Sequence, residues 1–346
     1  LYEDEEVTCT QEHFFTPEII DFLDGTTWGT EDTLYEHKKT QERIDALMDP
    51  VLIIMRIHGS LAGMVVIERR WVHNGSFSCK AYYFRYLATK VTFRNRRLVG
   101  VVGRKLINML REAETDKAVY YAFVEESNHR SMNYLQRIGY HSTARVRTVG
   151  FSRYFPKSDP RMVKISRQSR VEIINLLEKQ FCDFRLVHFN HILQDTEYFV
   201  LREGQEIIAG VQPHPAVWVI KNIPGRLGPH VLRLMPYIPI LRKLLNPNNF
   251  QFLALEGCFY RKGREKDLVK LWESVLNHFR LKSALIWLDS KDPLTKYLNN
   301  HARLGLLNVF AKRAETQLMT LPENLSSSEA EALKHGPFYT TGFDFV

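Results

Sequence analysis

The same short motifs occur twice, in the same order, along this chain of 346 residues. Each half has a turn glycine shortly before an Ala-Gly pair, and later a Tyr-Leu pair before another glycine. The matched residues are Gly59 with Gly204, Ala62-Gly63 with Ala209-Gly210, Tyr134-Leu135 with Tyr297-Leu298, and Gly139 with Gly305. Because the matches keep their order, they predict a duplicated fold whose two copies are each of ordinary domain size.

The boundary between the two copies is expected at residues 155–160, a polar, proline-containing segment without periodicity. It separates a first domain of residues 1–154 from a second of residues 161–346. The chain is 45% hydrophobic and 25% charged, which suits domains with their own cores. Four scattered cysteines argue against a disulfide framework or a zinc site, and no apolar run is long enough to span a membrane. These features predict a cytoplasmic protein with no membrane partner and no bound metal.

Hydrophobic periodicity predicts mixed α and β structure in the first copy. The expected elements are, in order, a helical region at 16–47, strands at 51–57, 61–70 and 79–93, a helix at 100–111, a strand at 118–124, a helix at 131–138 and a strand at 145–151. The second copy repeats this order and adds an apolar insertion at 226–245, for which a packed helix pair is favoured over a lid or an interfacial patch. The fold class is therefore α/β (α+β), with helices flanking a mixed, mostly antiparallel sheet in each copy.

A basic segment joins the strand that ends near residue 93 to the following helix. The chain carries a formal net charge of +8, and residues 90–111 contain seven Lys or Arg and no Asp or Glu. The N–H groups of a first helical turn favour an anion, and Gly100 lets the backbone approach it closely. A phosphorylated ligand suits this segment, although a nucleic acid would use the same charges, so charge alone does not choose between them.

Two motifs of the first copy resemble the GNAT superfamily of N-acetyltransferases. Arg97-Leu98-Val99-Gly100-Val101-Val102 is similar to the family's coenzyme A loop, Gln/Arg-x-x-Gly-x-Gly/Ala. Asn128-x-x-Ser131, an apolar helix and Gly139-Tyr140 are similar to its second motif. Val102 departs from the pattern, where a small residue is usual. Its side chain either points away or narrows the phosphate pocket, in which case Gly103 partly compensates. The resemblance covers residues 50–150, and the second half is related by topology only.

The resemblance implies a tandem of GNAT-like domains in which the first binds acetyl-CoA (coenzyme A) and the second is degenerate. The backbone at the end of the strand would contact pantetheine, and the loop amides would hold the pyrophosphate. The implied cofactor-binding residues are Thr92, Phe93, Arg97, Leu98, Val99, Gly100, Val101, Val102, Gly103, Arg104, Asn128 and Ser131. Asn128 equally suits a helix N-cap. In the second copy, Glu265 and Asp267 stand where a pyrophosphate would bind and oppose it.

Acetyl transfer to an amine needs a base for the ammonium and a proton for the departing thiolate. At the position where the family usually has a tyrosine, this chain has Leu135. Tyr134, one residue earlier, is therefore the candidate acid, although it also suits a core aromatic. Glu125 and Glu126 are candidate bases, with a solvent-facing role as the alternative. His188 and His191 are expected to be ordinary surface histidines.

These observations predict an acetyl-CoA-dependent N-acetyltransferase acting on an amine of a small molecule, peptide or protein. The alternatives are a non-catalytic acyl-CoA-binding sensor and an RNA- or aminoacyl-tRNA-dependent acyltransferase. The acceptor is not specified by the sequence, and a homodimer is left open.

Overall fold

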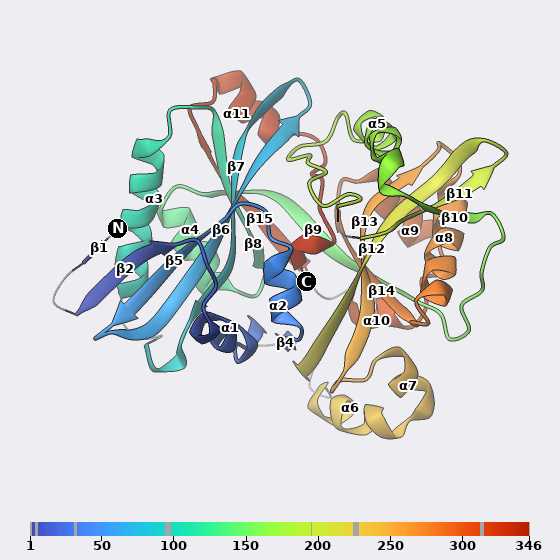
Figure 1. Cartoon of the computed structure of the whole chain (residues 1–346), viewed down its shortest axis with the longest axis horizontal. Coiled ribbons are helices and arrows are strands. Elements are labelled where there is room, and N and C mark those ends of the chain that lie inside the picture. Colours follow the sequence, from blue (N-terminus) through green and yellow to red (C-terminus); the bar gives the residue numbers. More distant parts are fainter. Residues whose placement is uncertain are drawn as a thin grey trace. The chain divides into compact units, whose positions relative to one another are not determined.

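The computed structural model describes residues 2–3, 6–30, 33–93, 98–194, 196–223, 228–311 and 315–345. The chain forms two compact units (Figure 1). Unit 1 comprises Leu1–Thr26, Thr40–Ala144 and Gln317–His335, and unit 2 comprises Thr27–Lys39, Arg145–Thr316 and Gly336–Val346. Compared with the division predicted at residues 155–160, each unit includes a segment from the other half of the sequence. Among the described residues, no helix is long and apolar enough to cross a membrane.

Unit 1 contains a mixed, mostly antiparallel sheet, as the sequence predicts. Its strands, in spatial order, are β1 (Tyr2–Glu3), β2 (Val7–Glu12), β5 (Pro50–Ile57), β6 (Ser60–Asn74), β7 (Phe77–Thr89), β8 (Ala118–Glu125), β15 (Glu315–Glu323) and the first residues of β9 (His141–Ser152). Neighbours from β1 to β7 pair antiparallel, whereas β7 and β8 are parallel. The predicted turn at Gly59 is confirmed by its φ of +76°, and Gly75, between β6 and β7, has a φ of +69°.

Within the described residues of unit 1, five α-helices accompany this sheet: α1 (Pro17–Asp24), α2 (Thr40–Asp45), α3 (Leu98–Ala113), α4 (His129–Arg137) and α11 (Ser327–Lys334). Ile107 of α3 and Leu135 of α4 pack with Tyr120 and Ala122 of β8. The crossover from β7 through α3 to β8 therefore covers one face of the sheet and brings the start of α3 to the carboxyl end of β7.

The helical prediction for residues 16–47 is wrong in its middle. Between α1 and α2 lie β3 (Trp28–Thr30) and β4 (Thr33–His37), a hairpin that belongs to unit 2. There β4 pairs with β12 (Glu206–Asn222), and Tyr35 stacks on Trp218 with ring centroids 4.3 Å apart. Aromatic and β-branched residues favour a strand once a partner strand is present, and this partner lies far along the sequence.

Unit 2 repeats the order seen in unit 1. Its remaining strands are β10 (Met162–Ile165), β11 (Tyr198–Glu203), β13 (Phe250–Tyr260) and β14 (Ser283–Asp289), followed in space by the last residues of β9. Its helices are α5 (Arg170–Gln180), α6 (Gly228–Leu234), α7 (Pro239–Leu244), α8 (Glu265–His278), α9 (Pro293–His301) and α10 (Leu307–Ala311). The parallel pair is β13 with β14, joined through α8. In the order of elements along unit 2, β13 and β14 take the place that β7 and β8 take in unit 1.

The apolar insertion forms α6 and α7. Met235 and Leu245 are buried in a cluster with Ala216 and Phe250 of the neighbouring strands. These two residues match the packed arrangement predicted for the insertion, while Tyr237 remains 81% exposed.

Candidate functional site

The start of α3 in unit 1 has the character of an anion site. No acidic residue lies in its first turn, Val101 is exposed, and Arg104 also faces solvent. Arg97 lies outside the described residues, as do the side chains of Leu98 and Val99. The first-turn N–H groups therefore have no carboxylate of their own helix beside them, which is the arrangement that favours a bound anion.

Val102 points into the core. It is 7% exposed and packs with Met55, Ile57 and Ala62 of the sheet and with Phe93. Of the two orientations considered for this residue, the one that narrows a phosphate pocket is therefore wrong. The β-branched side chain anchors α3 to the sheet.

Tyr134 of α4 lies against two glycines of α3. Its hydroxyl donates to the Gly100 carbonyl at 3.4 Å, and a Cβ placed on Gly103 would come within 2.5 Å of the same hydroxyl. Gly103 thus makes room for the tyrosine. Burial raises the pKa of Tyr134, against the opposing effect of Arg104, so the hydroxyl is protonated at neutral pH.

The strand before α3 ends earlier than predicted. β7 stops at Thr89, and the prediction of a strand through Thr92 and Phe93 is wrong, because Val91–Phe93 form a 3-10 turn. Pairing with β6 ends where Thr89 faces Gly63, and the Lys90 N–H donates to the Ala62 carbonyl at 2.8 Å. Strand backbone suitable for an extended ligand is therefore available only up to Thr89.

A gap opens between β7 and β8 at the edge of the sheet where α3 begins. The parallel ladder joins Lys80–Tyr83 to 118–121 and stops there, although both strands continue. Beyond this point β7 bulges, because Tyr86 and Leu87 together lie opposite Val65 alone, and Tyr86 has a φ of +52°. Ligand sites in sheets of this kind form where parallel strands part at their carboxyl ends.

A buried ion cluster holds β7 at the bulge, on the face away from α3. The Arg70 guanidinium donates to Glu68 at 2.8 Å and to the Tyr121 hydroxyl at 2.8 Å, and Arg85 donates to Glu68 at 3.4 Å. Arg85 also donates to the Tyr86 hydroxyl at 3.0 Å. Arg70 is not among the site residues predicted from the sequence. The sequence does indicate such a cluster, because Glu68 and Arg70 are two residues apart and therefore share one face of an otherwise apolar strand.

The motif asparagine and the candidate bases have defined partners. Asn128 caps α4 by accepting from the Ser131 N–H at 3.1 Å, which confirms the cap. Glu126 accepts from Gln317 of β15 at 3.3 Å, the strand on the other side of β8 from the gap. The Glu125 carbonyl accepts from the Asn128 N–H at 2.9 Å. A role for either carboxylate as a base stays a prediction.

Comparison with solved structures identifies the architecture. A crystal structure of Saccharomyces cerevisiae N-myristoyltransferase with bound myristoyl-CoA and inhibitors matches 98% of this chain and 87% of its own, with a TM-score of 0.64 and 8% identity. A second structure of that enzyme, with bound myristoyl-CoA, matches 95% of this chain and 87% of its own, with a TM-score of 0.59 and 7% identity. N-myristoyltransferase is a GNAT-fold enzyme. The chain has the GNAT fold. No protein-family model matches it, and no curated protein matches its sequence.

The two GNAT-like units differ at the helix that follows the first parallel strand. In unit 2 that helix is α8, and its first turn contains Glu265 and Asp267. Asp267 accepts from Arg161 at 3.0 Å and from Arg264 at 2.6 Å. Carboxylates of the chain itself thus occupy the start of α8, as the sequence predicts.

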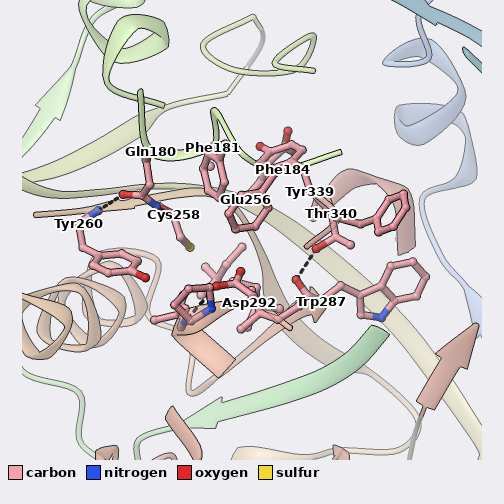
Figure 2. Close-up of a pocket in the computed structure, with 17 residues that line it drawn as sticks. Gln180, Phe181, Phe184, Glu256, Cys258, Tyr260, Trp287, Asp292, Tyr339 and Thr340 are labelled. Carbon is pink, nitrogen blue, oxygen red and sulfur yellow. Dashed lines mark hydrogen bonds between the residues drawn. The ribbon is translucent and has the colours of Figure 1, made fainter. Parts of the chain in front are cut away.

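Unit 2 has a cavity of about 80 Å³ at its own strand gap. The ladder between β13 and β14 joins only 253–254 to 284–285, and the cavity lies beyond it. Figure 2 shows Gln180 and Phe181 on one side and Trp287 and Asp292 on the other. This gap in unit 2 corresponds to the gap between β7 and β8 in unit 1, which lies beside the start of α3.

Buried histidines lie behind this cavity, in contrast to the surface positions predicted for His188 and His191. Both are less than 7% exposed, and the His191 ring stacks on Phe343 with centroids 4.0 Å apart. His214 forms a hydrogen bond of 2.8 Å with the buried Glu256 carboxylate, which lines the cavity. Spacing alone did not show that Tyr339 packs against the His188 ring and Phe343 against the His191 ring.

Asp292 is expected to make the stability of unit 2 depend on pH. Burial raises its pKa to about 7, although its hydrogen bond from the Leu294 N–H lowers it. A carboxyl whose pKa rises on folding stabilises the fold below its unfolded pKa of about 4, and this contribution is lost as pH rises through 7. Asp292→Asn keeps an N-cap acceptor but removes the charge. Between pH 5 and pH 8 the wild type should lose roughly 2–3 kcal/mol of unfolding free energy relative to the variant. Urea unfolding at both pH values tests this, and parallel pH profiles would contradict it.

Proposed function

We propose that this chain is an acyl-CoA-dependent N-acyltransferase that uses acetyl-CoA and transfers its acyl group to an amine. The observation that carries the proposal is the acid-free start of α3 beside the gap between β7 and β8, present in unit 1 and replaced by carboxylates in unit 2. The fold adds support, because the N-myristoyltransferase of the same architecture binds myristoyl-CoA in its crystal structures. The loop resemblance favours acetyl-CoA as the donor.

Acetyl-CoA would supply an activated thioester carbonyl. The N–H groups of the first turn of α3 would hold the pyrophosphate, with Arg97 and Arg104 adding charge-assisted hydrogen bonds. The backbone near the bulge of β7 would align the pantetheine arm and donate to the developing oxyanion. A new bond then forms between the acceptor nitrogen and the acyl carbon while the carbon–sulfur bond breaks.

Tyr134 is the proposed proton donor to the departing thiolate. Its raised pKa keeps the proton on the hydroxyl at neutral pH. Glu125 and Glu126 are the proposed bases for the acceptor ammonium, acting through water.

The proposal is tested at Gly100, where a Cβ has room: the nearest heavy atom outside the helix backbone, in the Tyr134 ring, lies 3.7 Å away. Gly100→Asp adds to α3 the kind of charge that unit 2 already has at α8, and Gly100→Asn is its neutral isostere. Calorimetry with acetyl-CoA should show that the aspartate variant binds about tenfold or more weakly than the asparagine variant. The same titration with myristoyl-CoA compares the affinity of the chain for a long and a short acyl donor. If the wild type gives no heat with either donor, or the two variants bind alike, the proposed site is wrong.

A further inference from the structure

The cavity of unit 2 contains buried acceptors that the proposed function does not use. Glu256 and Tyr339 both line it and are at most 5% exposed. Glu256 Oε1 and the Tyr339 hydroxyl have no hydrogen-bond partner within the described part of the chain. A buried polar atom without a partner costs about 1–3 kcal/mol, so the two atoms together indicate a ligand that donates hydrogen bonds.

Two carboxyl groups, those of Glu256 and Asp292, line the cavity. Burial raises the pKa of Glu256, but the hydrogen bond from His214 and the charges of His191 and His188 outweigh it, and the net shift is downward. Glu256 is therefore ionised at neutral pH. Asp292 adds a second carboxyl from the other side of the cavity, next to the carboxylate of Asp289. A cation balances such a pair better than a neutral donor does.

Aromatic rings make up much of the remaining lining. They belong to Phe181, Phe184, Tyr260, Trp287, Phe338 and Tyr339. Ring faces attract organic cations and offer no oxygen ligands to a hard metal ion. The cavity of about 80 Å³ has room for several water-sized groups, since one water needs roughly 10–15 Å³ on the same measure. A charged head on a short alkyl stem fits these dimensions.

We propose that the cavity between β13 and β14 binds a primary ammonium group. Its three N–H bonds match three acceptors, namely Glu256, Asp292 and the Tyr339 hydroxyl, and its stem lies among the rings. The site belongs to unit 2 alone, so it does not depend on coenzyme A binding at α3. The same head group occurs in small alkylamines and in lysine side chains, and the test separates these two sources.

The test is a titration of the whole chain with ethylammonium chloride at pH 8 and constant ionic strength, followed by calorimetry and by tryptophan fluorescence, since Trp287 lines the cavity. Saturable binding is expected for ethylammonium but not for 1-propanol, its neutral analogue of similar size, nor for NaCl. Glu256→Gln and Asp292→Asn should each weaken binding at least tenfold. Glu178→Gln, an exposed carboxylate of α5, should leave it unchanged. A lysine peptide and its Nε-acetylated form then show whether a side chain can enter.

Two results would overturn the proposal. One is an equal response to ethylammonium, 1-propanol and NaCl, which means that the cavity holds water only. The other is unchanged affinity in Asp292→Asn, a variant expected to fold at least as stably as the wild type at pH 8. This second variant keeps the test decisive if Glu256→Gln unfolds because it loses the His214 bond. Loss of acetyl-CoA binding by unit 1 would affect neither result.

Discussion

Replacement of Tyr134 by phenylalanine is expected to lower kcat roughly 100- to 1,000-fold and to change the KM for acetyl-CoA by less than about twofold. The change removes one hydroxyl and leaves the ring against Gly100 and Gly103, so the contact between α3 and α4 persists. The proton for the thiolate is lost, together with the 3.4 Å hydrogen bond to the Gly100 carbonyl. The measurement is release of the coenzyme A thiol with a panel of amines and peptides, alongside a pH profile.

Gly103→Ala supplies the matched control for this variant. The added Cβ would lie 2.5 Å from the Tyr134 hydroxyl, so the ring must move and kcat should fall in the wild-type background. In the Tyr134→Phe background the oxygen is gone, and the same alanine should cost little more. Full activity of Tyr134→Phe, with a change in thermal stability alone, would leave Tyr134 as a helix contact.

The elements predicted best from the sequence are those whose own residues determine them. The helix at 100–111 and the strand at 118–124 have strong periodicity and correspond to α3 and β8. The cap at Asn128 needs only local backbone chemistry and is confirmed, and the motif glycine at 139 has a positive φ of +98° directly after its helix. Local signals of this kind do not depend on distant partners.

The predictions that failed depend on distant partners. Residues 28–37 became a hairpin because β12 offers a pairing edge, and no local pattern shows that edge. The burial of His191 follows from Phe343 near the end of the chain, and the orientation of Val102, which the sequence left open, follows from the apolar cluster below it. For the same reason, only part of the candidate site could be predicted from the sequence. Its loop is local, whereas the gap between β7 and β8 arises from where a ladder between two strands stops.

The duplicated glycines allow the two copies to be compared energetically. Gly305→Ala is expected to lower the unfolding free energy by roughly 3–5 kcal/mol, of which about 1–2 arises from a positive φ and the rest from overlap. Its φ is +89°, and a Cβ there would lie 2.3 Å from the Ser152 carbonyl oxygen, which is backbone and cannot turn aside.

Gly139→Ala, at the matching position of unit 1, should cost only about 1–2 kcal/mol. Its φ is +98°, but the nearest neighbour of a Cβ is the Leu321 side chain at 3.4 Å, an ordinary contact. Urea unfolding of both variants gives the comparison, and equal losses would contradict it. A positive φ is thus common to both copies, although α4 ends directly before Gly139 whereas α9 already ends at His301. The difference in cost comes from what has packed against each glycine, so the second copy should tolerate no side chain at a position where the first accepts one with moderate strain.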